Sequence, residues 1–359
     1  MALSDDILYI LLNHYAPCMR PMVIHANWRW RDVVLADPRP EVHPNALSRI
    51  VLRAAAHGGV GLLRWIYGRE EGQALLQRRG SDGVTALMCA AAKYGHASVI
   101  DMCDREWTNT QYTASTVLGI AAWYGRSALV EALVARMRSA TPAVAEIDIL
   151  EPLVRNAARQ GRDTLLRQWL VGENVPLSIK NVALRAAALG GQLATLRFVH
   201  EEFGADDFGM ALRSAAHGGH LHVLEHLWPL IWKSYPGEML VDTEARMFLL
   251  NGAIESAVFG VADERVLRCL KEWGATSIRG CLSLAVERGH VHVLHLCKEW
   301  GINDWNDALV TAAQYGHIDV IRLCRAWGAT DLRDALHSAR LHKRVHVVRM
   351  FKEEWHIED

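Results

Sequence analysis

A short phrase recurs along the chain and limits the fold more than any other feature. Residues 289–301 read GHVHVLHLCKEWG, and residues 316–328 read GHIDVIRLCRAWG. A glycine after an alanine-rich stretch marks each copy, and successive marks lie 27 to 41 residues apart. Periods of this length are typical of arrays in which similar units stack on one another. The marker positions are Gly59, Gly95, Gly125, Gly161, Gly191, Gly219, Gly260, Gly289 and Gly316, with Lys343 in the corresponding place of a tenth copy.

Each copy predicts two short helices. The first, as in ALVTAAQYG, carries small alanines on one stripe, so another helix can approach it closely. The second, as in HIDVIRLCRAWG, places Val320, Ile321 and Cys324 at helical spacing. Because two short helices bury too little surface alone, neighbouring units must stack. The sequence therefore predicts an all-α solenoid of about nine or ten units.

Stop and start signals support this division. A glycine ends the second helix of four copies, where a left-handed cap needs no Cβ. Three residues later a good N-cap residue opens the next helix, which leaves no room for a long β-hairpin between these units. The glycines are Gly204, Gly274, Gly301 and Gly328, and the N-cap residues are Asp207, Ser277, Asp304 and Asp331.

One copy resembles a known repeat family. Residues 83–100, GVTALMCAAAKYGHASVI, closely resemble the ankyrin-repeat consensus. The resemblance covers about residues 45–355, and we assign residues 45–359 to an ankyrin-type array. Most copies lack the threonine-proline-leucine-histidine phrase and several are shorter than the usual ~33 residues, so their hairpin fingers should be trimmed or absent. The KEWGAT phrase is also similar to the divergent ankyrin arrays of large DNA viruses.

Residues 1–40 do not follow the repeat and predict a small helical module. The opening LSDDILYILL, with Trp30, Arg31 and Val34 after a proline-containing turn, resembles the F-box, which binds the adaptor of cullin-RING ubiquitin ligases. Ser4 replaces the usual proline, and Trp28-Arg29 stands where cysteine-arginine is usual. The alternative is that these helices only cap the open end of the array. The resemblance implies that the adaptor would contact Leu3, Ile7, Leu8, Leu11 and Trp30.

Composition excludes several partner classes. The formal net charge is -1, so no basic field is available to hold nucleic acid. The seven cysteines form no C-x-x-C pair, which favours an intracellular, cytoplasmic protein, in the host cell if the chain is viral. The first residues do not resemble a signal peptide, and no stretch of about 18 uncharged apolar residues follows. We expect no membrane association and a monomer.

Motifs for catalysis and metal binding are missing from the sequence. No HExxH, GxSxG or P-loop pattern occurs. His222 with His226, and His292 with His295, have spacings that could hold zinc, but His222 and His292 occupy one repeat slot that other copies fill with serine or aspartate. We therefore expect no enzyme activity, no metal and no cofactor.

Two residue types recur in the second helices. Trp107, Trp273, Trp300, Trp327 and Trp355 share a slot near the helix end, which predicts a stacked aromatic ladder rather than a ligand site. Cys269, Cys297 and Cys324 share another slot and are predicted to be small core residues.

Candidate partner-binding residues lie at the end of the first helices. The pair before the marker glycine varies between copies and mixes aromatic with charged residues, the types that become interface anchors. Packing between neighbouring units is an equally good explanation for any single member. The candidates are Tyr94, Trp123, Tyr124, Arg159, His217, Arg288 and Tyr315.

Two longer links interrupt the rhythm, at residues 136–148 and 228–245. The second carries Trp232 and Tyr235 between prolines, which adds both to the candidate contact residues, although such links are sometimes only disordered.

Three functions are compatible with these features. In the first, which we favour, the F-box-like module attaches a ubiquitin ligase to a target protein that the array holds. In the second, the array is a scaffold that sequesters a host factor. In the third, the chain is a structural component of a viral particle or complex. All three require protein partners and no chemistry.

Overall fold

The computed structural model describes residues 51–52, 54–68, 83–107, 111–140, 146–171, 175–234 and 243–357. Every regular element within these ranges is a helix, which confirms the predicted all-α class. The chain divides into two compact units, Met1–Val175 and Pro176–Asp359.

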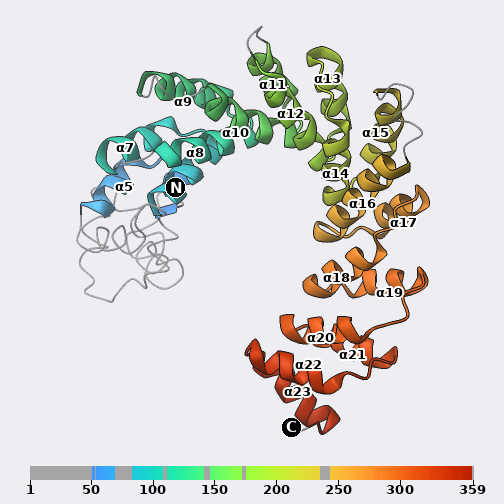
Figure 1. Ribbon diagram of the computed structural model, residues 1–359. Coiled ribbons are helices and arrows are strands. Elements are labelled where there is room, and N and C mark those ends of the chain that lie inside the picture. The colour runs from blue at the N-terminus through green and yellow to red at the C-terminus, as the bar shows by residue number, and fades with distance from the viewer. Residues whose placement is uncertain are drawn as a thin grey trace, which may run out of the picture. The chain divides into compact units, whose positions relative to one another are not determined.

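The first unit consists of helix pairs joined by tight turns (Figure 1). Helical residues at 51–52 and 54–56 precede α5, and helical residues 83–94 precede α7. The remaining pairs are α8 with α9 and α10 with α11. The bounds are α5 Val60–Tyr67, α7 Ala97–Trp107, α8 Gln111–Trp123, α9 Ser127–Ala140, α10 Glu146–Arg159 and α11 Asp163–Leu170.

The second unit repeats the same pairing (Figure 1). The first helices of the pairs are α12 Leu177–Leu189, α14 Phe208–Gly218, α16 Thr243–Phe259, α18 Ile278–Arg288, α20 Asn306–Tyr315 and α22 Leu332–Leu341. The second helices are α13 Leu193–Phe203, α15 Leu221–Ser234, α17 Glu264–Glu272, α19 Val291–Glu299, α21 Ile318–Ala326 and α23 Val345–Trp355. Two helices per repeat were predicted from the sequence, and both are present.

Small residues let the first helices pack closely. In the second unit each first helix contacts its own second helix, and each but α22, the last, contacts the first helix of the next pair, as α12 does with α13 and α14. In the first unit α8 likewise contacts α9 and α10. Paired alanines such as Ala187 and Ala188 of α12, and Ala215 and Ala216 of α14, are fully buried at these contacts. An alanine stripe shortens the distance between helix axes. The core is therefore continuous along each row of pairs.

Left-handed residues end the first helices, and in two copies they differ from the glycine used as the repeat mark. Lys343, in the place of the marker glycine, has a φ of 57° and takes the left-handed conformation that most of those glycines have. In the first copy, however, the left-handed residue is Gly58 and not Gly59, and in the seventh it is Ala262 and not Gly260. Gly260 is needed for another reason, because a Cβ there would lie 2.0 Å from the carbonyl oxygen of His217.

Most of the two longer links is helical. Residues 136–140 extend α9 and residues 228–234 extend α15, so the prediction of open links there is wrong. Pro229 lies inside α15, although a proline commonly ends a helix. Its side chain is exposed, and the helix continues through it to Ser234.

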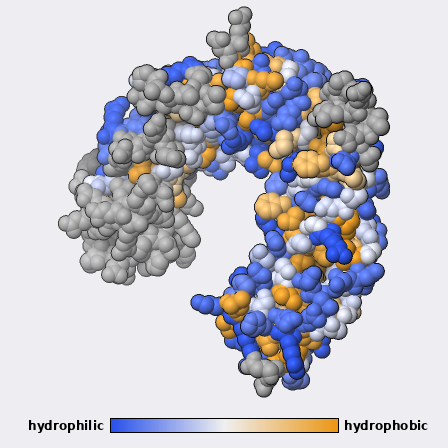
Figure 2. Space-filling view, viewed as in Figure 1, coloured by the Kyte–Doolittle hydropathy of each residue, from blue (hydrophilic) through white to orange (hydrophobic). Residues whose placement is uncertain are grey.

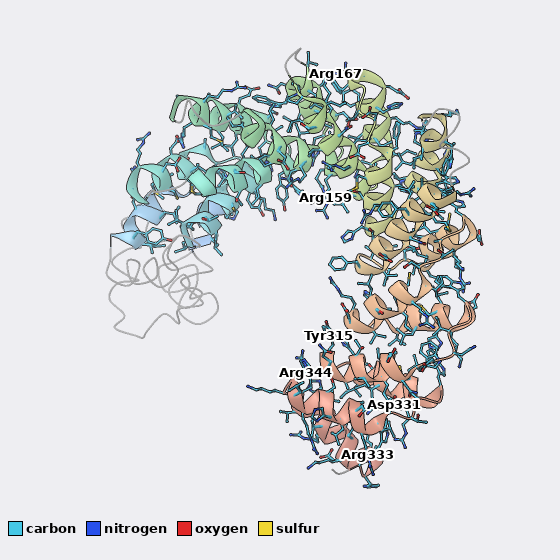
Figure 3. All side chains as sticks on the ribbon, in the orientation of Figure 1. Arg159, Arg167, Tyr315, Asp331, Arg333 and Arg344 are labelled. Atoms are coloured by element: carbon cyan, nitrogen blue, oxygen red, sulfur yellow. The ribbon has the colours of Figure 1, made fainter. Side chains whose placement is uncertain are left out.

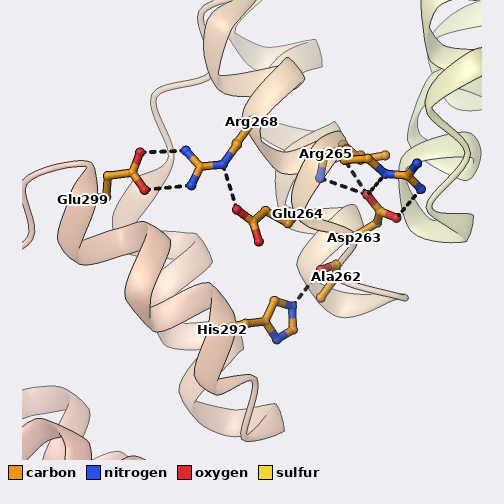
Figure 4. Close-up of polar contacts among 8 residues, drawn as sticks. Ala262, Asp263, Glu264, Arg265, Arg268, His292 and Glu299 are labelled. Carbon is orange, nitrogen blue, oxygen red and sulfur yellow. Dashed lines mark hydrogen bonds and ion pairs between the residues drawn. The ribbon is translucent and has the colours of Figure 1, made fainter.

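Exposed polar contacts join the second helices of neighbouring helix pairs. Arg268 of α17 donates two hydrogen bonds, of 2.6 and 2.8 Å, to the carboxylate of Glu299 in α19 (Figure 4). The pair Arg322 and Glu354 repeats this contact between α21 and α23. Because these side chains are exposed, the pairs specify alignment more than they stabilise the fold.

The recurring tryptophans and cysteines occupy the predicted slots. Cys297 and Cys324 are buried, and Cys269 is half-buried. The described tryptophans of this slot are half-buried, and Trp273 stacks on Trp228 of the preceding helix pair, with ring centres 4.5 Å apart. At the last two copies a cation of the preceding pair takes the place of the expected aromatic neighbour. Lys298 lies 4.5 Å from the ring centre of Trp327, and Arg325 lies 4.1 Å from that of Trp355.

Candidate functional site

The candidate residues of the first unit form one connected exposed row. The Lys93 ammonium lies 5.4 Å from the ring centre of Tyr94 and 5.2 Å from that of Tyr124 in the next pair. The Arg159 guanidinium lies 5.3 Å from the ring centre of Trp123. Tyr94 is 48% exposed and Tyr124 is 38% exposed. We call Lys93, Tyr94, Trp123, Tyr124 and Arg159 the aromatic-cation row.

Backbone geometry explains why these side chains face solvent. The alanines just before the row, such as Ala91 and Ala92, are fully buried. Successive helix residues are rotated by about 100°, so the residues after a buried pair turn outward. In addition, Arg126 donates from Nε to the carbonyl oxygen of Lys93 at 3.0 Å. A residue of the next helix pair therefore fixes the end of the helix that carries Lys93 and Tyr94.

The second unit holds a shorter cluster of the same kind. The Arg288 guanidinium lies 3.8 Å from the ring centre of Phe259, and the ring of His217 lies 5.9 Å from the same ring. Tyr315, 39% exposed, ends α20 in the next pair (Figure 3). Phe259 is 48% exposed and was not among the candidates. Its position immediately before Gly260 could have revealed it.

In the second unit, the same hydrogen bond joins one helix pair to the end of the first helix of the preceding pair. His317 donates from Nε2 to the carbonyl oxygen of Glu287 at 2.8 Å, and Arg344 donates from Nε to that of Gln314 at 2.8 Å. Figure 3 shows Arg344 close to Tyr315, at the same end of the helix rows. Histidine and arginine are interchangeable at this position because both present an N–H at similar reach.

Trp232 belongs to a different surface. Its ring meets that of Trp228 edge to face at 4.9 Å, and the Arg246 guanidinium lies 5.6 Å from its centre. A groove beside it lies among α14, α15 and α16, and its walls include the apolar Met210 and Phe248 together with Arg213 and Arg246. Phe248 is 79% exposed. Figure 2 shows apolar patches of this kind between polar residues on the visible face.

Several candidate residues lie outside the described residues. These are Tyr235 and the proposed adaptor-binding set Leu3, Ile7, Leu8, Leu11 and Trp30.

Two of the four histidines with zinc-like spacing, His222 and His292, serve as structural donors. His222 donates from Nε2 to the carbonyl oxygen of Gly191 at 3.0 Å, and His292 donates to that of Ala262 at 2.8 Å (Figure 4). Both side chains are exposed, as expected from their slot. Within the described ranges, no group of three or more histidine, cysteine, aspartate or glutamate residues is placed to hold a metal. None of the described helices is both long and apolar enough to cross a bilayer.

Burial keeps the cysteine thiols protonated. It raises the pKa of Cys103, Cys297 and Cys324 to about 12 each. The thiolate is the reactive form of cysteine. These side chains are therefore packing residues rather than nucleophiles.

In the second unit, three links between successive helix pairs are each held by an asparagine side chain. We call this contact the asparagine clamp, which sequence reasoning missed. The Oδ1 of Asn251 in α16 accepts hydrogen bonds from the backbone N–H groups of Thr276 at 2.7 Å and Ser277 at 2.9 Å. Asn181 does the same for the link before α14, and Asn306 for the link before α22. The signal was an asparagine two residues before a buried alanine in three first helices.

The clamp changes the role of the predicted N-cap residues. The Asp207 side chain does accept from the backbone N–H of Met210, at 3.3 Å. Those of Ser277 and Asp331 make no cap bond. Asp304 is not the N-cap of α20, which is Trp305. At Ser277 and Asp331, an asparagine side chain of the preceding first helix therefore takes the place of a capping bond.

No protein-family model matches the sequence, and no curated protein is significantly similar to it.

Proposed function

We propose that the chain is a non-enzymatic adaptor of the ankyrin-repeat type that brings a target protein to a cullin-RING ubiquitin ligase. The array would hold the target, and residues 1–40 would bind the ligase adaptor. The observation that carries the protein-binding part is the aromatic-cation row, in which Tyr94 and Tyr124 stay exposed on a rigid helix framework. Exposed aromatics next to cations are typical anchors of protein interfaces.

The ankyrin assignment rests on three features together. The helices come in antiparallel-type pairs with short links, left-handed residues close the first helices, and the consensus-like phrase at 83–100 falls in one such pair. The described links carry no strand, which agrees with the trimmed fingers expected from their length. The ligase part rests on the F-box-like residues alone.

The ligase part is tested by gel filtration of the purified full-length protein with the cullin-RING adaptor. Co-elution is expected for the wild type and is expected to be lost in the double variant Leu8→Ala, Trp30→Ala with an unchanged circular dichroism spectrum. If neither protein co-elutes, residues 1–40 are a cap and the chain is a scaffold that sequesters its partner.

The array part is tested by comparing captured proteins. The variant Tyr94→Ala, Tyr124→Ala should lose a host protein that the wild type retains. Glu131→Gln is the matched control, because Glu131 lies on the second-helix side, where it accepts a hydrogen bond from Gln168. Equal capture by all three proteins would remove the aromatic-cation row from the binding surface.

A further inference from the structure

One link of the second unit lacks the asparagine clamp. Position 279 in α18 corresponds to Asn251 in α16 and Asn306 in α20, and it holds Arg279. The link that Arg279 should clamp, residues 301–305, leaves the backbone N–H groups of Asn303 and Asp304 without a hydrogen-bond partner among the described residues. The three clamped links satisfy both equivalent groups.

The unclamped link also has a different conformation. Its second residue is Ile302, half-buried, where the other links have the buried alanines Ala205, Ala275 and Ala329. The backbone N–H of Ile302 still donates to the carbonyl oxygen of Cys297 at 3.0 Å, as those of Ala275 and Ala329 do to their own helices, so the difference begins after residue 302. Correspondingly, α20 begins at Asn306, one residue later than the equivalent start of α18 at Ile278.

A groove opens at this place. It lies between α18 and α20, and its walls include Arg279, Ser283, Asn303, Asp304 and Asp307. Groups that could fill it must accept from the two backbone N–H groups. A carboxylate would do so, but Asp304 and Asp307 outnumber the single cation Arg279 in the walls, and this excess negative charge disfavours a further anion. A neutral carboxamide accepts through its oxygen and can donate its NH₂ to the acidic side chains.

The clamped links show how such a group sits. Asn181 accepts from the backbone of Asp206 at 2.9 Å and donates from Nδ2 to the Asp206 carboxylate at 3.2 Å. Asn251 likewise donates from Nδ2 to the hydroxyl of Thr276 at 3.1 Å. One carboxamide therefore satisfies donors and an acceptor of the same link.

We propose that the groove between α18 and α20 receives an asparagine or glutamine side chain of a bound protein, which replaces the missing clamp. This inference deepens the proposed function and rests on it, because the occupant belongs to a protein partner. The partner's carboxamide makes the hydrogen bonds that an asparagine of the preceding first helix makes in the three clamped links. Binding would then order the 301–305 link.

The test uses nuclear magnetic resonance of the ¹⁵N-labelled full-length protein with N-acetyl-asparagine N-methylamide as the probe. Saturable shifts are expected at the amides of Asn303 and Asp304 and not at those of Thr276 and Ser277. The alanine analogue of the probe should shift neither pair, and the aspartate analogue should bind at least several-fold more weakly. Equal responses to the asparagine and alanine probes, or tighter aspartate binding, would overturn the carboxamide assignment.

Two variants complete the test. Arg279→Asn should close the site with an internal clamp and abolish the shifts at Asn303 and Asp304. Asn251→Ala should open the equivalent site, so that the probe now shifts Thr276 and Ser277. Persistence of the shifts in Arg279→Asn would refute the proposal. Because no ligase adaptor or target takes part, failure here is distinguishable from failure of the adaptor experiment.

Discussion

The substitution Asn251→Ala removes a complete clamp and gives the sharpest test of how neighbouring units are joined. The wild-type side chain accepts from two backbone N–H groups, at 2.7 and 2.9 Å, and donates to the Thr276 hydroxyl at 3.1 Å. A neutral hydrogen bond contributes about 0.5–1.5 kcal/mol net. Thr276 is exposed, so water can replace part of the loss. We expect a destabilisation of about 1–2 kcal/mol.

Urea unfolding followed by circular dichroism measures this change, and hydrogen exchange locates it. The amides of Thr276 and Ser277 should exchange about tenfold faster in the variant, since 1.4 kcal/mol corresponds to a factor of ten. Arg279→Ala is the matched control at the equivalent position, where no clamp exists, and its effect should stay within about 0.5 kcal/mol.

A loss of unfolding free energy in Asn251→Ala no larger than that in Arg279→Ala would refute a stabilising clamp. So would a larger loss with unchanged exchange at Thr276 and Ser277, because the lost stability would then lie elsewhere.

Three further predictions follow from individual contacts. Gly260→Ala places a Cβ against a backbone oxygen and should lower the unfolding free energy by about 1–3 kcal/mol. Gly204→Ala, at a φ of 71° with no atom within 4 Å, should lower it by only about 1 kcal/mol. Similar urea midpoints for the two variants would contradict this prediction. The hydrogen bonds and charge of Arg265 lower the pKa of Asp263. The Asp263 carboxylate therefore contributes to the unfolding free energy above about pH 4, and this contribution is lost as the pH falls through the lower folded pKa. The difference in unfolding free energy between wild type and Asp263→Ala, measured from pH 6 to pH 2, should shrink on acidification, and a constant difference would refute this prediction. Cys297, whose pKa burial raises to about 12, should react with iodoacetamide at pH 8 only after unfolding, and rapid native labelling found by mass spectrometry would disprove its burial.

Periodicity predicted the helix pairs because burial of a repeated apolar pattern leaves few alternatives. It placed Lys343 at the marker position of the last copy, where the residue has the left-handed conformation that most of the marker glycines have. It misplaced the mark at Gly260, because glycine serves there for close approach and Ala262 takes the turn conformation. Sequence alone cannot separate these two uses of glycine.

The clamp was beyond sequence reasoning for a different reason. Its partners are backbone N–H groups about 25 residues away, and any residue provides those, so only the asparagine leaves a trace in the sequence. Phe259 escaped because the repeat phrase before Gly260 is divergent. The extension of α15 through Pro229 was missed because local propensity was overruled by packing of the helix.

The hydrogen bonds that join successive helix pairs at the ends of their first helices separate surface chemistry from assembly. Arg126, His317 and Arg344 bind backbone carbonyls, of Lys93, Glu287 and Gln314 respectively. Every amino acid offers the same carbonyl, so the side chains at these positions can change without weakening the joint. The exposed residues beside these joints, the aromatic-cation row among them, can therefore change one at a time while the helix pairs keep their alignment.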